Sequence, residues 1–253
     1  MANIVLDAGT TWSKIIEKTS SSLMKDYADY LLKSENGFNY YVLPSAVLKN
    51  IDFKFDKATG HMSLSMLNDK KDYENEVIAL IQGFRKKIEE DAIILDMGSR
   101  DSKWAQFRDG KFKDLDWNNN CSSSTGATIE MLLKFYNVDV KDLKVSDEKY
   151  VITCGIFGLE KIMDDIAKGS DAKTAISKFI HGIAFNAWNF AKKPSKIYLS
   201  GGFCENKCFV ESLEKYCEVV PLGRFLLCEG LLKTVWLLRN VKPAEIRFKK
   251  NTL

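Results

Sequence analysis

The sequence lacks the features of a membrane protein, a secreted protein or a protein that binds polyanions. No apolar run reaches the ~20 residues that a membrane-spanning helix needs, and the longest candidate, residues 225–238, is interrupted by Glu229 and Lys233. The 37 Lys and Arg nearly balance the 34 Asp and Glu, so the formal net charge of +3 gives no reason to expect nucleic-acid binding. No signal peptide precedes the first apolar residues, 4–6. We therefore expect a cytoplasmic protein without membrane or nucleic-acid partners.

A low-complexity linker is also absent from the 253 residues, of which 45% are hydrophobic. Such a chain can fill the core of one large domain or of two small ones, and two domains would meet at a tight hinge near residue 90. In a cytoplasmic protein, the six cysteines are expected to be reduced thiols or metal ligands rather than disulfides.

An internal repeat is the most informative feature that is present. Residues 4–14 read IVLDAGTTWSK and residues 93–103 read IILDMGSRDSK, so six of the eleven positions are identical at a spacing of 89 residues. Each copy is an apolar run that ends in Asp, followed by a glycine-containing turn and a second apolar run. This pattern predicts two β-hairpins.

The chemistry of these hairpins points to a bound nucleotide. A glycine in the turn lets the backbone approach a phosphate, whose oxygens can bind N–H groups and the hydroxyls of Thr10, Thr11 or Ser99. An Asp at an exposed strand end, as we expect for Asp7 and Asp96, can hold Mg²⁺ through water. Two such copies would clamp one triphosphate between two domains. A single copy would be ordinary turn chemistry.

A third glycine element follows near the C-terminus. Residues 196–200 have the pattern of a buried strand, and they run into Gly201 and Gly202 and then into a helix-like stretch, 206–216. This order of elements is typical of the actin/Hsp70/sugar-kinase fold (ribonuclease H-like, α/β), in which strand–Gly–Gly–helix holds the adenosine. We expect two duplicated subdomains around a nucleotide cleft, residues 1–90 and 91–253, with the last helix able to pack back onto the first. Further helices are predicted at 74–89, 128–136, 156–167, 172–190 and 225–238, with Gly169 ending the third of these.

Six segments together resemble one family. Residues 4–14 and 93–103 resemble its two phosphate motifs, and 58–60 (ATG) its A-T-G-Y-G-R segment. Residues 118–126 (NNNCSSSTG) are similar to M-N-D-K-C-A-A-G-T-G, 153–157 (TCGIF) to T-C-x-V-F, and 199–206 (LSGGFCEN) to G-G-V-A-x-N. The chain thus resembles, nearly end to end, the BcrAD/BadFG-type ATPases, most closely the small activators of 2-hydroxyacyl-CoA dehydratases. It departs from the pattern around the cysteine of the fourth segment, where two asparagines replace Asp-Lys and a serine replaces a glycine.

The resemblance implies a homodimer that holds one [4Fe–4S] cluster through Cys121 and Cys154 of each subunit. Both cysteines precede a predicted helix, where the helix dipole favours the thiolate that iron requires. The alternative is that they are small buried hydrophobic residues. The other four cysteines could form a second site within one chain, but core packing is the favoured interpretation; they are Cys204, Cys208, Cys217 and Cys228.

The resemblance also implies an activity, an ATPase coupled to electron transfer. A donor such as ferredoxin or flavodoxin reduces the cluster, and ATP hydrolysis drives the electron into a partner iron–sulfur dehydratase or reductase. Asp7 and Asp96 would hold Mg²⁺ and water. The expected nucleotide-binding residues are Gly9, Thr10, Thr11, Lys14, Gly98 and Ser99 for the phosphates, Gly201, Gly202 and Asn206 beside the nucleoside, and Asp101 and Lys103, which could equally be exposed hairpin residues.

Two other functions fit part of the pattern. A small-molecule kinase of the same fold would use the hairpins but would leave Cys121 and Cys154 without a role. A non-catalytic nucleotide-binding adaptor would explain the altered residues around Cys121 as the mark of a lost cluster.

Overall fold

The computed structural model describes residues 2–118, 126–153 and 155–232, and the chain divides into two compact units. The first comprises residues 1–90 and 225–253, and the second comprises residues 91–224. Among the described residues, no helix combines the length and the hydropathy needed to span a bilayer.

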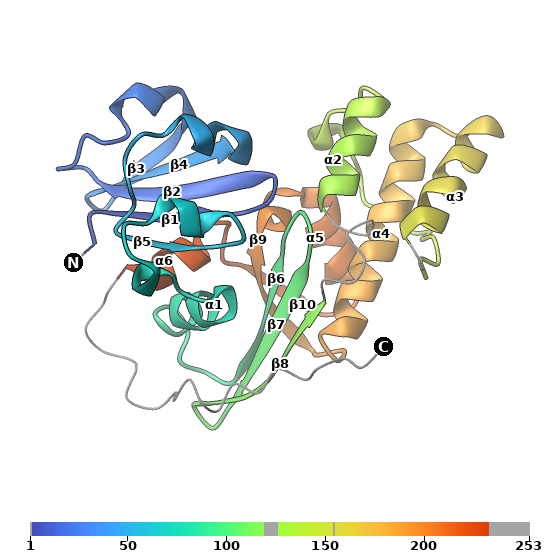
Figure 1. Cartoon of the computed structure of the whole chain (residues 1–253). Coiled ribbons are helices and arrows are strands. Elements are labelled where there is room, and N and C mark those ends of the chain that lie inside the picture. The colour runs from blue at the N-terminus through green and yellow to red at the C-terminus, as the bar shows by residue number, and fades with distance from the viewer. Residues whose placement is uncertain (1, 119–125, 154, 233–253) are drawn as a thin grey trace. The chain divides into compact units, whose positions relative to one another are not determined.

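The first unit is built on a five-stranded sheet with the strand order β3-β4-β2-β1-β5 (Figure 1). Its strands are β1 (Ile4–Ala8), β2 (Trp12–Lys18), β3 (Leu31–Glu35), β4 (Phe38–Pro44) and β5 (Lys57–Thr59). The β1–β2 hairpin predicted from the repeat is confirmed, and β5 lies parallel to β1 on its other side. Every residue of β1 is buried, which explains its uninterrupted apolar run up to Asp7.

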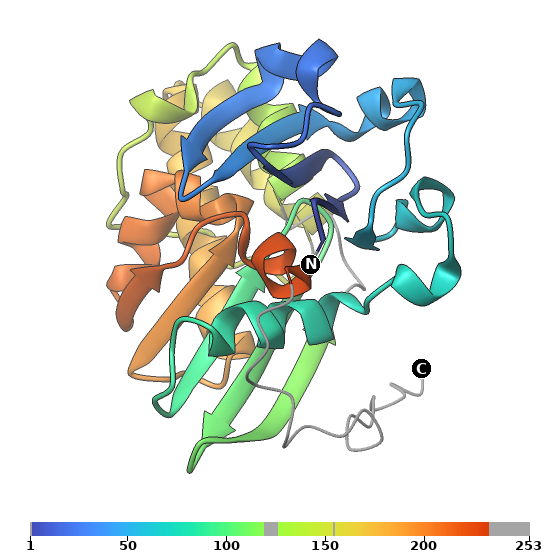
Figure 2. The same cartoon turned by 90° about the vertical axis from the view of Figure 1, so that its left-hand side faces the viewer.

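Two helices far apart in the sequence pack together in this unit, α1 (Glu76–Arg85) and α6 (Leu226–Leu231) (Figure 2). Their backbones can touch because Gly83 and Gly230 have no Cβ. A Cβ at either position would collide with a carbonyl of the other helix. Lys86 Nζ donates to the carbonyl oxygens of Glu229 and Leu232, and burial lowers the pKa of Lys86 to about 8. Short 3₁₀ turns complete the unit: η1 (Lys25–Tyr30), η2 (Ser45–Asn50), η3 (Ser63–Met66) and η4 (Lys70–Asp72).

The second unit repeats the hairpin within a sheet of order β10-β9-β6-β7-β8. Its strands are β6 (Ala92–Met97), β7 (Ser102–Arg108), β8 (Lys111–Asn118), β9 (Lys196–Gly201) and β10 (Glu218–Pro221). The antiparallel β6–β7 hairpin is confirmed, and β9 lies parallel to β6 as β5 does to β1. Its helices and 3₁₀ turns are α2 (Gly126–Phe135), η6 (Val140–Asp142), α3 (Gly155–Ala167), α4 (Ala172–Phe190), η7 (Gly202–Glu205) and α5 (Lys207–Glu214).

The helix predictions hold where end signals are strong. The bounds of α4 match the prediction, and Asp171 caps its start by accepting from Thr174 N at 3.2 Å. Gly169, at φ +97°, ends α3 as predicted, in a Schellman arrangement. The prediction for 74–89 was too long, because Asn75 caps α1 and the helix ends at Arg85. The predicted helix 225–238 was also too long, because α6 ends at Leu231 and Leu232 is extended; residues 233–238 lie outside the described part of the chain.

Candidate functional site

In the first unit, a row of polar side chains crosses the sheet where β1 ends. Asp7 on β1 is directly opposite Lys14 on β2 and Thr59 on β5. Lys14 Nζ lies 3.0 Å from Asp7 Oδ2. Asp7 is only 5% exposed, so the expectation of an exposed strand end was wrong. The hydroxyl of Thr59 is fully buried and has no hydrogen-bond partner within the described part of the chain.

The turn of this hairpin is held in place by Ser45, the first residue of η2, directly after β4. A Cβ on Gly9 would lie 2.5 Å from the carbonyl oxygen of Trp12, so only glycine fits there. Ser45 Oγ donates to Gly9 O at 2.6 Å, and Ser45 N donates to Thr11 O at 2.9 Å. These bonds leave the exposed Thr10 and the half-buried Thr11 at the tip of a fixed loop.

The ATG segment lies beside the same strand end. Gly60 has φ +93°, and a Cβ there would lie 2.5 Å from the carbonyl oxygen of Ala8. Ser63 Oγ donates to Gly60 O at 2.7 Å and so fixes the turn after β5. The segment that the resemblance singled out is therefore in contact with the backbone that follows Asp7.

In the second unit, the corresponding row is longer. Asp96 on β6 is opposite Lys103 on β7 and Ser200 on β9, and Lys103 is opposite Trp117 on β8. Asp96 is 5% exposed and Lys103 is 3% exposed, so neither residue is exposed. Lys103 Nζ is 3.1 Å from Asp101 Oδ1 but 3.7 Å from Asp96 Oδ2. Asp96 Oδ1 and Ser200 Oγ are buried without a hydrogen-bond partner among the residues described.

The second turn is bonded to the start of α2. Gly98 N donates to Asp101 O at 2.9 Å, which closes the turn. Gly126 N donates to Gly98 O at 3.3 Å, and Ala127 N donates to Ser99 O at 3.0 Å. The first two residues of α2 are thus tied directly to the turn that carries the predicted phosphate ligands.

The Gly-Gly element lies at the end of β9, next to β6: Gly201 is the last residue of the strand and Gly202 begins η7. Gly201 has φ +92°, and a Cβ there would collide with the backbone of Met97. Open space surrounds the position of a Cβ on Gly202, which begins η7. Asn206 caps α5, because its Oδ1 accepts from Phe209 N at 3.0 Å. The structure therefore gives Gly201 and Asn206 roles in the fold, whereas Gly202 leaves room for a neighbouring group.

The duplication extends to a third strand in each unit, β5 and β9, and sequence reasoning missed this correspondence. At the end of each of these strands, Thr59–Gly60 and Ser200–Gly201 place a buried hydroxyl opposite the Asp and a positive-φ glycine against the residue that follows the Asp. The sequence signal is a hydroxyl residue followed by Gly at the end of an apolar strand.

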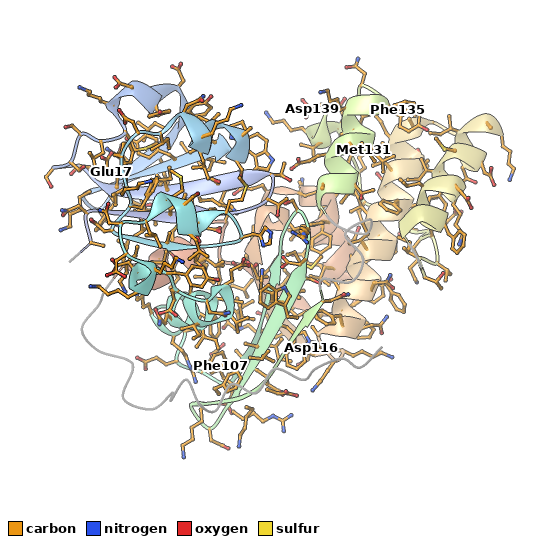
Figure 3. The ribbon with its side chains drawn as sticks, viewed as in Figure 1. Glu17, Phe107, Asp116, Met131, Phe135 and Asp139 are labelled. Carbon is orange, nitrogen blue, oxygen red and sulfur yellow. The ribbon has the colours of Figure 1, made fainter. Side chains whose placement is uncertain are left out.

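A further buried carboxylate, Glu17 on β2, belongs to the fold rather than to this site (Figure 3). Its Oε1 accepts from Leu23 N at 2.8 Å and from Ser21 Oγ at 2.7 Å. Tyr41 O–H donates to Oε2 at 3.3 Å. With its acceptors occupied by the chain itself, Glu17 fixes the loop after β2.

The cysteines fall into two groups. Cys121 and Cys154, the predicted cluster ligands, lie outside the described residues; α2 is described from Gly126 and α3 from Gly155. The remaining four are free thiols, of which Cys208, Cys217 and Cys228 are buried, and this confirms core packing for these three. Burial raises the pKa of Cys204 to about 12. In the described part of the chain, no group of three or more His, Cys, Asp or Glu could hold a metal ion.

Two units with the same hairpin, the same parallel third strand and a carboxylate at the same place define the actin/Hsp70/sugar-kinase fold predicted from the sequence. No family model matches the sequence. The chain is 24% identical over 222 residues to the (R)-2-hydroxyglutaryl-CoA dehydratase activating ATPase of Acidaminococcus fermentans, covering 79% of this chain and 82% of that one.

Two solved structures of dehydratase activators share the fold. The activator of the 2-hydroxyisocaproyl-CoA dehydratase from Clostridium difficile, with bound ADPNP, superposes with a TM-score of 0.70 at 17% identity, covering 91% of this chain and 92% of that one. Component A of the A. fermentans (R)-2-hydroxyglutaryl-CoA dehydratase gives 0.67 at 19% identity, covering 91% and 96%. The resemblance to the dehydratase activators is confirmed.

Proposed function

We propose that the protein is an ATP-hydrolysing activator that drives an electron from a [4Fe–4S] cluster, shared by two copies of the chain, into a partner iron–sulfur enzyme such as a 2-hydroxyacyl-CoA dehydratase. The observation that carries the proposal is the pair of buried carboxylates, Asp7 and Asp96, behind glycine turns in duplicated hairpins. The similarity to an activating ATPase along most of the chain supports it.

The residues at the second hairpin suit a hydrated magnesium ion. A buried carboxylate oxygen without a partner, such as Asp96 Oδ1, costs free energy unless a cation or a water molecule fills its surroundings. Mg²⁺ keeps several waters and binds through one or two carboxylates together with substrate phosphates, and it would neutralise charge on the β- and γ-phosphates. Asp96 would orient the attacking water, and Lys103 would supply a fixed positive charge beside it.

The remaining polar groups would bind the nucleotide. The fixed loop around Gly9 presents Thr10 and Thr11 to the phosphates, and Lys14, held by Asp7, supplies positive charge. In the second unit, Gly98 and Ser99 would play the matching part. Gly202 has open space beside it, which suits contact with the nucleoside.

For the cluster, we propose Cys121 and Cys154 of each of two subunits, with a ferredoxin or flavodoxin as the electron donor. The cluster supplies one electron at low potential. The chain's own part is to connect nucleotide and cluster. Because Gly126 and Ala127 are bonded to the turn at Gly98 and Ser99, a nucleotide that shifts this turn also shifts the start of α2, five residues after Cys121.

The nucleotide part is tested by ATP hydrolysis in purified protein. Asp96→Asn keeps the shape of the side chain but removes its charge, and it should lower kcat by about 10²–10⁴-fold, the usual contribution of a positioned proton acceptor. Asp7→Asn should also lower the rate. The matched control is Asp114→Asn, which removes a half-exposed carboxylate bound to Lys192 in the same unit. Wild-type turnover in the Asp7→Asn/Asp96→Asn double variant would contradict the proposal.

The cluster part is tested by iron content after anaerobic purification. Wild type should carry about four irons per dimer, and Cys121→Ser and Cys154→Ser should each lose the iron and weaken the dimer. Cys204→Ser and Cys208→Ser are the controls and should keep both. Iron that survives in the Cys121→Ser/Cys154→Ser variant would exclude these ligands and favour a kinase or an adaptor.

A further inference from the structure

Trp117 lies on β8, at the edge of the second unit's sheet, and it borders the proposed catalytic row. It is directly opposite Lys103 on β7, and Lys103 is directly opposite Asp96 on β6. Side chains opposite one another on adjacent strands share a face of the sheet. Its neighbour Asp116, exposed on β8 and opposite Trp104, belongs to the other face because side chains alternate along a strand. Trp117 therefore stands in line with the two buried charges.

A chain of contacts connects Trp117 with Asp96. The indole Nε1–H of Trp117 donates to Asp101 Oδ2 at 2.6 Å. The other oxygen of Asp101, Oδ1, lies 3.1 Å from Lys103 Nζ, and the same ammonium is 3.7 Å from Asp96 Oδ2. The ring of Trp117 also packs under this ammonium, 5.2 Å from its centroid. The cation is thus bonded to Asp101 and lies beyond hydrogen-bond distance of Asp96.

We propose that Trp117 is a positioning residue for ATP hydrolysis: its indole fixes Asp101, Asp101 holds Lys103 back from Asp96, and Asp96 keeps an oxygen for the magnesium-bound water. The inference rests on the proposed function of Asp96. The residues of β8 up to Trp117 belong to none of the motifs that carry the resemblance. The proposed role of this strand is to position Asp101 and Lys103 beside Asp96.

The first unit has the same row of an Asp opposite a Lys, but at the corresponding positions it lacks the Trp–Asp pair that binds the lysine in the second unit. Val42 on β4 occupies the place of Trp117, because it is opposite Lys14 as Trp117 is opposite Lys103. Trp12 replaces Asp101 in the aligned repeat. There the lysine closes onto its carboxylate, with Lys14 Nζ 3.0 Å from Asp7 Oδ2. Where both members of the relay are missing, the lysine pairs directly with the strand-end Asp.

The test is the kinetics of Trp117→Phe, which keeps an aromatic ring under Lys103 but removes the N–H donor. Loss of one charge-assisted hydrogen bond should lower kcat by about tenfold and leave the KM for ATP unchanged, because the backbone bond from Gly98 N to Asp101 O that closes the phosphate-binding turn is retained. Trp188→Phe is the control: it deletes an indole N–H that donates to Pro194 O at 3.0 Å, away from the row. It should hydrolyse ATP as wild type does.

Two further measurements separate this role from a loss of structure. If Trp117 acts through Asp101, the double variant Trp117→Phe/Asp101→Asn should be no slower than Asp101→Asn alone. In ¹H–¹⁵N spectra, the indole resonance missing from Trp117→Phe should lie downfield in wild type and move upfield in Asp101→Asn, whether or not ATP is turned over.

The outcomes are distinguishable. A wild type that hydrolyses no ATP contradicts the proposed function, and the indole resonance then decides whether the contact exists. Given an active wild type, the positioning role is overturned by an unchanged kcat in Trp117→Phe, by a loss confined to KM, or by additive losses in the double variant. An indole resonance that ignores Asp101→Asn also overturns it.

Discussion

In the first hairpin, Lys14 pairs with Asp7 at 3.0 Å, whereas in the second, Lys103 lies 3.1 Å from Asp101 and 3.7 Å from Asp96. The two hairpins share six of eleven residues, including the Asp and the Lys of each pair. Among the positions that differ is the residue two before the lysine, which is Trp12 in one copy and Asp101 in the other.

The comparison shows that one duplicated hairpin holds its lysine in two different ways. A carboxylate paired directly with a lysine is a neutral pair that can bind phosphate through the lysine's remaining donors. A carboxylate whose lysine is held elsewhere keeps an acceptor oxygen for water or a cation. We infer that the first hairpin binds and the second carries the chemistry, although their backbones have the same strand pairing.

Replacing the lysine of each hairpin, Lys14 or Lys103, should give the largest difference in free energy of unfolding between the two copies. Lys103→Met leaves Asp96 and Asp101 in a nearly buried site without their cation, and breaking a buried pair in this way costs about 3–5 kcal/mol. Lys14→Met leaves one carboxylate, and the Lys14 side chain is already 16% exposed. We expect its cost in free energy of unfolding, measured by urea denaturation, to be clearly smaller.

The control for both is Lys173→Met, which breaks an exposed pair with Asp142 and should cost less than about 1 kcal/mol. Equal losses for Lys14→Met and Lys103→Met would contradict the difference inferred between the hairpins.

The two copies share a positive-φ glycine packed against the neighbouring strand, Gly60 in the first unit and Gly201 in the second. Substitution of these glycines tests whether that contact stabilises the fold. Gly60→Ala and Gly201→Ala each place a Cβ against the backbone of the adjacent strand at positive φ, so we expect losses of about 2–4 kcal/mol from strain and overpacking together. Gly37→Ala is matched in φ, at +79°, but its Cβ meets nothing within 4 Å. It should cost only about 1 kcal/mol in the same measurement. A Gly60→Ala variant as stable as Gly37→Ala would show that the close contact does not matter.

The sequence was sufficient for the two hairpins and for several helices, but it was insufficient for the pairing of strands far apart in the chain. The hairpins, α4 and the end of α3 could be predicted because apolar periodicity, Asp171 and Gly169 are local signals. The pairing of β5 with β1 and of β9 with β6 joins segments far apart in the chain, so the positions of Thr59 and Ser200 opposite the carboxylates could not be read from it. Asp7 and Asp96 are buried because β5 and β9 pair with β1 and β6 beside them, so their burial could not be predicted either.

The role of Trp117 could not be predicted for a related reason. Its place opposite Lys103 depends on the register between β7 and β8, which shifts by an irregularity between Gln106 and Phe107. A tryptophan immediately before the predicted cysteine segment, 118–126, carries no local signal that would join it to Asp101. Only the structure gives the register between β7 and β8 that places Trp117 opposite Lys103.

The smallest expected effect is on the pH dependence of stability, and it should differ between a histidine of the first unit and one of the second. The sequence has two histidines: His61 in the first unit is exposed, and His181 on α4 in the second is 3% exposed. His181 Nδ1 is 3.0 Å from Glu148 O, and Nε2 is 2.8 Å from the Tyr216 hydroxyl. A carbonyl only accepts, so Nδ1 donates and the neutral ring accepts from Tyr216 through Nε2.

Protonation of His181 would replace that acceptor with a second donor. Burial, the largest cause, lowers the pKa of His181 below its ordinary value of about 6.5, and the nearby Lys149 and Lys215 act in the same direction. The unfolded chain therefore takes up this proton first, so stability is fully present above about pH 6.5 and falls as the pH drops through that value. In urea titrations between about pH 5.5 and 8, His181→Gln should flatten this part of the profile, and His61→Gln should leave it unchanged. If the two variants changed the profile alike, the loss at low pH would have to come from groups other than the buried histidine of the second unit.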